Sequence, residues 1–343
     1  MKKVLSLLLV LLVTFTIAGC AKDETFTVAL LVPGAVTDGG WSQSAYEGLL
    51  AIEEELEDVE IRYTENVTSA NAEKVMADYA RAGVDVVIGH GMEYFDIADA
   101  INEEYEDTFF VITSTTSHQA DNIASIKTNV MEMGFIAGYV LYEMGHDEMI
   151  FFESAPYTSI VQSGWGAAAG FEYANSIDTS GREIKTDIVL MNNNNDVNAS
   201  KTLALTMANS ADWNVDKLAF CSNSNDATRG SILAAEELGI PMVGFYSQKQ
   251  SESDYVLMDV LTDNNKTFIQ VVELIRAGNA EGINYNFGVA DEVVFPTELY
   301  SSFNGGVPAG LQDVLDQLVE DIASGKIDAT QITKDWAEAN GEA

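Results

Sequence analysis

The feature that most constrains the fold is a regular alternation of short apolar segments with longer amphipathic ones, which begins at Phe26. The predicted strands of the first set are Thr27–Val32, Val59–Tyr63, Val84–Ile88, Thr108–Ile112 and Ile123–Lys127, and the helices between them are Gln43–Leu56, Ala70–Ala82 and Asp96–Tyr105. Near-continuous apolar strands separated by helices are typical of a parallel sheet that is covered on both faces. The pattern therefore predicts an α/β lobe.

A second set of the same kind follows. Its predicted strands are Glu148–Phe152, Ile184–Leu190, Lys217–Phe220 and Pro241–Phe245, and its helices are Met131–Met144, Ile160–Asn175, Asn198–Asn209 and Ala227–Leu238. The chain then adds a strand at Tyr255–Asp259, a helix at Lys266–Ala277, a looser segment at Phe287–Phe295 and a last helix at Ala309–Ile322. A chain of 343 residues is long enough for two such lobes, each with its own core.

The first predicted strand leads directly into a candidate ligand site. Its apolar run stops at Pro33-Gly34, and a glycine-rich loop carries Asp38 and Trp41 into the first helix. Open α/β sheets bind ligands at the carboxyl ends of their strands. A carboxylate beside a flat apolar ring suits a small, polar, partly aromatic ligand. The alternative is that Asp38 is a turn residue and that Trp41 packs into the lobe.

Other strands end in similar candidate residues. His90 and Met92 follow the third predicted strand, and Ser114 follows the fourth. In the second set, Asn223 and Tyr246 stand where two strands end. We expect these side chains to line a cleft between the lobes, although His90 also fits a buried structural histidine. Asn223 could instead cap the helix that follows it.

The amino terminus predicts export and a lipid anchor. Lys2 and Lys3 precede an apolar run, Val4–Ile17, which is too short to span a bilayer as a mature helix. Ile17-Ala18-Gly19-Cys20 then matches a bacterial lipobox, so residues 1–20 are interpreted as a signal peptide and Cys20 as the lipidated residue. The alternative is an ordinary secretory signal with a chance cysteine. The expected location is the extracytoplasmic face of the cell membrane.

Charge and missing motifs argue against several classes of protein. Acidic residues outnumber basic ones by 54 to 17, which opposes nucleic acid as a partner because phosphate contacts need Lys and Arg. The three histidines are never at metal-ligand spacing, and neither a G-x-S-x-G elbow nor a P-loop is present. Besides Cys20 the only cysteine is Cys221, so no internal disulfide can form. We expect a binding protein, not an enzyme, with no metal or cofactor.

Several segments resemble one known family. The loop from Asp38 to Gly48 resembles the Asp-x-x-(Phe/Trp) segment of basic-membrane-protein (BMP) family lipoproteins, and Glu132–Tyr139 is similar to the family's E-x-G-x-x-A-G-Y helix start. Ala234–Ile240 and Val243–Phe245 fall where the family has A-A-(K/E)-E-x-G and V-G-(V/F). Members of the family are substrate-binding components of ABC importers, several of them for purine nucleosides. The resemblance implies a permease and an ATPase as partners.

The resemblance also implies a fold. It is the type I periplasmic-binding-protein architecture, in which two parallel-sheet α/β lobes are joined by a hinge of three crossovers. We place these near Lys127-Thr128, Ser247–Ser253 and Gly288–Glu292. Lobe 1 would then contain residues 26–127 and 253–288, and lobe 2 residues 128–247 and 292–326.

The ligand implied by the resemblance is a purine nucleoside or a nucleobase, held between aromatic side chains of the two lobes. The first aromatic position corresponds to Trp41, and Phe220 is the candidate for the second. Tyr246 occupies the position of the family's ribose-binding carboxylate, and the supporting lysine position is closest to Thr262. Asp259 is the candidate to replace the missing charge. The alternative function is a sensory lipoprotein that binds a small ligand and signals without transport.

Overall fold

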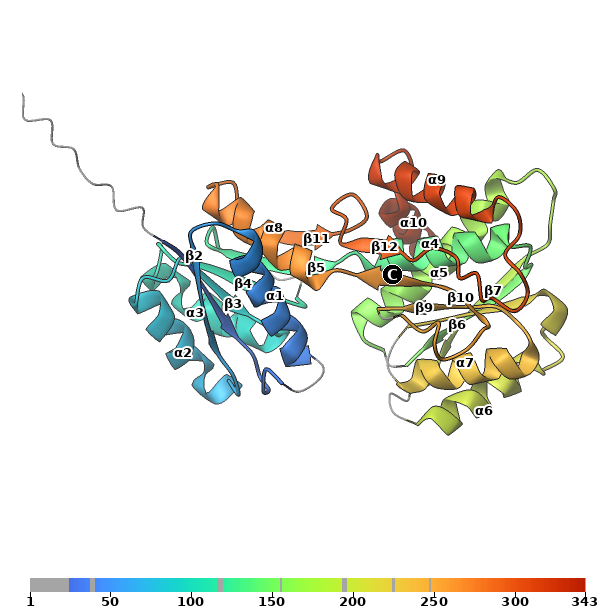
Figure 1. Ribbon diagram of the computed structural model, residues 1–343, viewed down its shortest axis with the longest axis horizontal. Coiled ribbons are helices and arrows are strands. Elements are labelled where there is room, and N and C mark those ends of the chain that lie inside the picture. The colour runs from blue at the N-terminus through green and yellow to red at the C-terminus, as the bar shows by residue number, and fades with distance from the viewer. Residues whose placement is uncertain are drawn as a thin grey trace, which may run out of the picture.

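The computed structural model describes residues 25–37, 41–115, 120–154, 156–192, 196–223, 226–246 and 248–342. It contains two lobes, each built on one six-stranded sheet with helices on both faces (Figure 1). The α/β class and the two parallel-sheet lobes expected from the sequence are confirmed.

All strands of the first sheet are parallel, and their order is β11-β5-β4-β3-β1-β2. The strands are β1 (Phe26–Leu31), β2 (Val59–Thr64), β3 (Val86–Gly89), β4 (Phe109–Thr113), β5 (Ile123–Thr128) and β11 (Asn284–Phe287). One face is covered by α1 (Trp41–Glu55) and α8 (Asn264–Arg276), and the other by α2 (Ser69–Arg81) and α3 (Phe95–Ile101). Two short 3₁₀ turns, η1 (Met92–Tyr94) and η2 (Asn102–Glu104), flank α3.

Strand β1 shows why the apolar runs are continuous. Val28 and Leu30 pack under α1 and α8, whereas Ala29 and Leu31 pack under α2 and α3. Because successive side chains of a strand point to opposite faces, a strand buried on both faces needs apolar residues at every position.

The second sheet has the order β12-β10-β9-β8-β6-β7, and only the short edge strand β12 is antiparallel to its neighbour. Its strands are β6 (Glu148–Glu153), β7 (Lys185–Leu190), β8 (Leu218–Asn223), β9 (Met242–Phe245), β10 (Val256–Thr262) and β12 (Val294–Pro296). One face packs against α4 (Val130–Glu143), α5 (Thr158–Ile177), α9 (Leu311–Ala323) and α10 (Ala329–Asn340). The other face packs against α6 (Val197–Ala208) and α7 (Asp226–Leu238), and η3 (Val215–Lys217) precedes β8.

Helices α4 and α5 are in backbone contact. A Cβ added at Gly134 would overlap the carbonyl oxygen of Ser163, and one added at Gly138 would overlap that of Ala167. Gly166 and Gly170 of α5 are equally tight against the backbone of α4. The glycines of the E-x-G-x-x-A-G-Y segment are therefore required by close helix packing.

The chain crosses between the sheets three times, from β5 to α4, from β10 to α8 and from β11 to β12. The first and third crossovers follow Thr128 and Phe287, close to the positions expected near Lys127-Thr128 and Gly288–Glu292. The second differs, because β10 pairs with β9 and β12 in the second sheet, so the chain leaves that lobe after Thr262 and not at Ser247–Ser253. Assigning all of residues 253–288 to the first lobe is therefore wrong for β10.

The carboxyl-terminal region also differs from expectation. Helix α10 lies beyond residue 326, where the predicted second lobe ended, and it packs against α4 and α5. The segment predicted to be loose, Phe287–Phe295, overlaps the end of β11 and the start of β12. Among the described residues, no helix combines the length and apolar character that a membrane crossing requires.

Candidate functional site

The strand ends of the first lobe bring together most of its candidate residues. Trp41 begins α1, which follows β1 and its loop; its side chain, like the whole of Asp38, lies outside the described part of the structure. Met92 begins η1 just after β3 and is 67% exposed, and Ser114 follows β4 and is also exposed. Because β1, β3 and β4 are parallel neighbours, the start of α1, Met92 and Ser114 follow strands that end at one edge of the sheet.

Unlike Met92 and Ser114, His90 is buried. Its Nδ1 lies 3.1 Å from the hydroxyl oxygen of Thr113, the last residue of β4, and its ring meets the Phe268 ring edge-on at 6.1 Å. The imidazole therefore ties the ends of β3 and β4 to α8. This geometry matches the structural role that the sequence left open for His90.

The second lobe presents Tyr246 at the end of β9. Its ring is 39% exposed, and its backbone is left-handed with φ of 68°. The amide N–H of Tyr246 donates to the Val260 carbonyl of β10 at 2.9 Å. Residues other than glycine rarely adopt this conformation, so the hydrogen bond to β10 holds Tyr246 in a strained turn at the end of β9.

Asp259 stabilises the loop that follows Tyr246 by accepting a backbone hydrogen bond from it. Its side chain is completely buried, and one carboxylate oxygen accepts hydrogen bonds from the Lys249 amide and the Tyr300 hydroxyl, both at 2.7 Å. Burial raises the pKa of Asp259 and lowers the pKa of the buried Lys249 side chain. Gly244 has no room for a Cβ because the carboxylate occupies that space. In this structure Asp259 positions the loop that carries Tyr246.

Asn223, at the end of β8, belongs to a buried polar group beneath α5. Its amide nitrogen donates to the Ile160 carbonyl at 3.2 Å and also bonds the Ser163 hydroxyl. Its side-chain oxygen is buried and has no hydrogen-bond partner among the described residues. Phe220 is wrong as the second ligand aromatic, because it is fully buried and packs edge-on against Phe152 at 4.9 Å.

Sequence reasoning missed Glu153, which lies beside Asn223 in the register of the sheet. The residue is only 5% exposed, and its Oε1 has no hydrogen-bond partner among the described residues. Burial, helped by the negative charge of Glu342, raises the pKa of Glu153 to about 7. The signal was present, because a carboxylate directly follows the apolar run Met149–Phe152, at the carboxyl end of a strand where α/β folds bind ligands.

Tyr157 was also missed. It precedes α5, in the loop after β6, and its side chain is 62% exposed. Together with Tyr246 it places large rings on the edge of the second sheet. An aromatic residue shortly after a strand end was the available signal.

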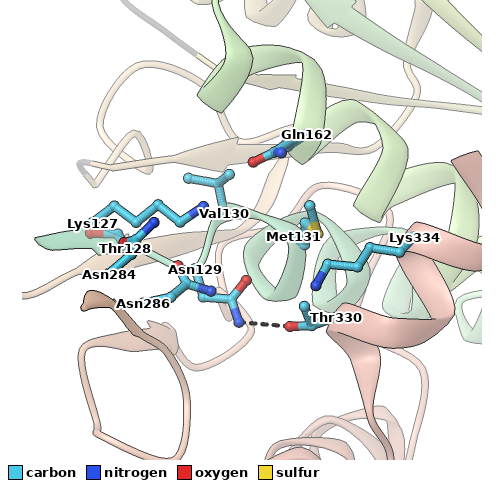
Figure 2. A pocket seen from close by; sticks show the side chains of 10 residues that line it. All are labelled: Lys127, Thr128, Asn129, Val130, Met131, Gln162, Asn284, Asn286, Thr330 and Lys334. Atoms are coloured by element: carbon cyan, nitrogen blue, oxygen red, sulfur yellow. Dashed lines mark hydrogen bonds between the residues drawn. The ribbon is translucent and has the colours of Figure 1, made fainter. Parts of the chain in front are cut away.

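A hollow of about 220 Å³ lies beside the first and third crossovers, and we call it the hinge hollow (Figure 2). The residues that line it are Lys127, Thr128, Asn129, Val130, Met131, Gln162, Asn284, Asn286, Thr330 and Lys334. They come from β5, β11, α4, α5 and α10. Asn129 joins two of these elements, because its amide nitrogen donates to the Thr330 hydroxyl at 2.7 Å.

The described residues contain no group of three or more His, Cys, Asp or Glu side chains that could hold a metal ion. Cys221 is a buried free thiol whose pKa is raised by burial. Cys20, the predicted lipidation site, lies outside the described residues.

Two mostly parallel α/β sheets joined by three crossovers define the fold of a type I periplasmic binding protein. The chain belongs to the Bmp family, described as PnrA-like ABC transporter substrate-binding proteins, whose pattern matches residues 25–324. The expected family is therefore confirmed. Proteins of this class work outside the cytoplasm.

Solved structures share the fold at low sequence identity. A transcriptional activator of the comK gene from Bacillus halodurans is 20% identical with a TM-score of 0.69, over 88% of this chain and 99% of that one. An ABC solute-binding protein from Conexibacter woesei is 19% identical with a TM-score of 0.66, over 88% and 97% of the two chains.

Curated relatives match over a shorter region. The transcriptional activator protein Med of Bacillus subtilis is 29% identical over 42% of this chain and 46% of its own length. A putative ABC transporter glucose-binding protein of Haloferax volcanii is 28% identical over 42% of this chain and 37% of its own length. The matches thus span less than half of these relatives.

Proposed function

We propose that this protein is the lipid-anchored, extracytoplasmic receptor of an ABC importer and binds a purine nucleoside or nucleobase between two closing lobes. Its partners would be a membrane permease and an ATPase. The protein would bind its ligand without turnover. Closure about the three crossovers would present the loaded form to the permease.

The observation that carries the ligand class is the exposure of large side chains at the strand ends of both lobes. Met92 of the first lobe is 67% exposed, and Tyr157 and Tyr246 of the second are 62% and 39% exposed. Exposed large side chains that follow strand ends, where α/β folds bind ligands, fit a ligand that covers them. A flat heterocycle stacked between rings would do so, and Trp41 stands in the corresponding part of the first lobe.

The polar groups at the same edges fit a base better than a sugar. Asn223 has an unpaired carbonyl oxygen within the described structure, and Glu153 beside it has an unpaired carboxyl oxygen. Both can accept hydrogen bonds from the N–H groups of a purine. The position of the family's ribose carboxylate holds Tyr246, and Asp259 is completely buried with its Oδ2 bound by the Lys249 amide and the Tyr300 hydroxyl. We therefore expect the ribose to add little affinity.

Mass spectrometry of the ligand that co-purifies with the protein tests this proposal, together with calorimetry of a purine base and its nucleoside. We expect a purine compound and a nucleoside preference below tenfold, about 1.4 kcal/mol. A sugar or an amino acid as the bound compound would refute the purine assignment. Sensing without transport is not favoured, since the family description names transport.

A further inference from the structure

We propose that the hinge hollow is a binding site for a small oxyanion, a phosphate or carboxylate group, which Lys127 and Lys334 hold between the two lobes. This site goes beyond the proposed purine site at the strand ends. Most of its residues belong to the elements around the first and third crossovers, and Thr330 and Lys334 belong to α10, a helix that the sequence did not predict.

The composition of the wall is the first argument. Two lysines line the hollow with amide and hydroxyl side chains, and no carboxylate is among them (Figure 2). The chain as a whole has 54 acidic and 17 basic residues. The charged side chains that line the hollow are both cationic, which favours an anion over a cation as its occupant.

The second argument is that, among the described residues, no carboxylate pairs with the half-buried Lys127 or with the exposed Lys334. Among the basic side chains that the structure describes, only Lys127 and Lys334 lack an ion pair, a carbonyl acceptor or an aromatic ring. The others are accounted for by such contacts. Burial lowers the pKa of Lys127, and the charge of Lys334 lowers it further. A bound anion would relieve both effects by supplying the missing negative charge.

The nearest carboxylate of α4, Glu132, bonds the wall residue Thr330, but its main contact is with the third crossover. Glu132 is directed at the third crossover, where its Oε2 accepts the Val289 N–H at 2.7 Å and fills the space beside Gly288. The α4 helix begins at Val130 in the wall of the hollow, and its N-cap residue Asn129 makes no side-chain cap hydrogen bond. The first amides of α4 therefore add partial positive charge to the same wall.

The position of the two lysines gives the site a mechanical consequence. Lys127 is on β5 of the first sheet, whereas Lys334 is on α10, which packs against α4 and α5 of the second lobe. One anion bound by both lysines would link the lobes beside the first crossover. It would thereby favour the hinge angle at which both ammonium groups reach it. The anion could be free inorganic phosphate or a charged group on the transported ligand.

The first possible source of the anion is free inorganic phosphate. It is tested by calorimetric titration of the full chain in detergent with inorganic phosphate, with sodium chloride holding the ionic strength constant. Lys127→Gln and Lys334→Gln should each weaken phosphate binding at least tenfold, and the double variant should abolish it. Lys326→Gln, which removes a lysine paired with Asp321 at 2.6 Å, is the matched control and should bind as the wild type does. Thermal melts check that every variant is folded.

A second titration compares a purine nucleoside with its monophosphate and tests the other source. If the ligand carries the anion, the monophosphate should bind at least tenfold tighter than the nucleoside, and the double variant should remove that difference. If the wild type and the double variant bind inorganic phosphate with equal affinity, and also bind the nucleoside monophosphate with equal affinity, the proposed anion site is wrong. Nucleoside binding would separately report on the proposed function, because neither lysine belongs to the purine site.

Discussion

Glu153 illustrates how a single buried group links stability to pH. The pKa of its carboxyl group is raised to about 7 in the folded protein, above the ordinary value near 4.3 of an exposed glutamate. Between these two values the folded state binds more protons than the unfolded state. The stabilising contribution of Glu153 to the unfolding free energy is therefore fully present below the unfolded pKa and is lost as pH rises toward 7.

We predict that Glu153→Gln removes this dependence. The wild type should lose up to about 3 kcal/mol of unfolding free energy between pH 4.5 and pH 8 through this group, and the variant should lose correspondingly less. Urea unfolding of both proteins at several pH values measures the difference. Parallel stability curves would show that Glu153 titrates normally.

A second residue-scale prediction concerns stacking. Trp41→Ala and Tyr157→Ala should each lower ligand affinity at least tenfold, because each removes stacking and apolar burial worth more than about 1.4 kcal/mol together. Leu50→Ala is the control, since Leu50 is a 40% exposed residue of the same helix as Trp41. Calorimetry with the co-purified compound measures the affinity. An unchanged dissociation constant in Trp41→Ala, with a much lower melting temperature, would make Trp41 a core residue.

At the scale of elements, the α4–α5 pair depends on the absence of side chains. Gly138→Ala should lower the unfolding free energy by about 3 kcal/mol or more, because its Cβ would overlap the Ala167 carbonyl of a backbone that cannot easily move. Gly48→Ala in α1 is the matched comparison. Its Cβ would lie 3.0 Å from the Phe268 ring, a side chain that can adjust, and alanine favours the helix by about 1 kcal/mol.

Urea unfolding measures both variants. We expect Gly48→Ala to stay within about 1 kcal/mol of the wild type, since the two effects oppose each other. Equal losses in the two variants would mean that backbone contact between α4 and α5 is not what the glycines protect.

At the scale of the whole molecule, three crossovers join two separately packed lobes. We predict that ligand binding closes them and reduces the radius of gyration, because stacking rings from both lobes must approach the same molecule. Small-angle X-ray scattering with and without the co-purified compound measures this. An unchanged scattering curve at saturation would contradict closure.

The anchor is a further whole-molecule prediction. If Cys20 is the lipidated residue, Cys20→Ala should leave the precursor uncleaved and abolish metabolic labelling with a fatty acid. Normal labelling of this variant would mean that the protein is attached in another way, or that Cys20 is not the acceptor.

The sequence by itself determined the architecture of the lobes. Each central strand is buried on both faces, so its apolar run is continuous and visible without a structure, as in β1. The same pattern locates strand ends, which is why Met92, Ser114, Asn223 and Tyr246 were found at the sheet edges. The glycines of α4 marked the family and also have a physical reason that the packing supplies.

Only the tertiary structure decided where individual side chains point and which sheet a strand joins. Moving one residue along a strand reverses the face, and Phe220 falls on the face that packs against α6 and α7. Strand β10 joined the second sheet through pairing with β9, a choice that its own apolar residues do not encode. Glu153, Asp259 and the hinge hollow depend on contacts between segments far apart in the chain. Local sequence patterns reveal burial and periodicity, whereas such long-range contacts exist only after the lobes have packed.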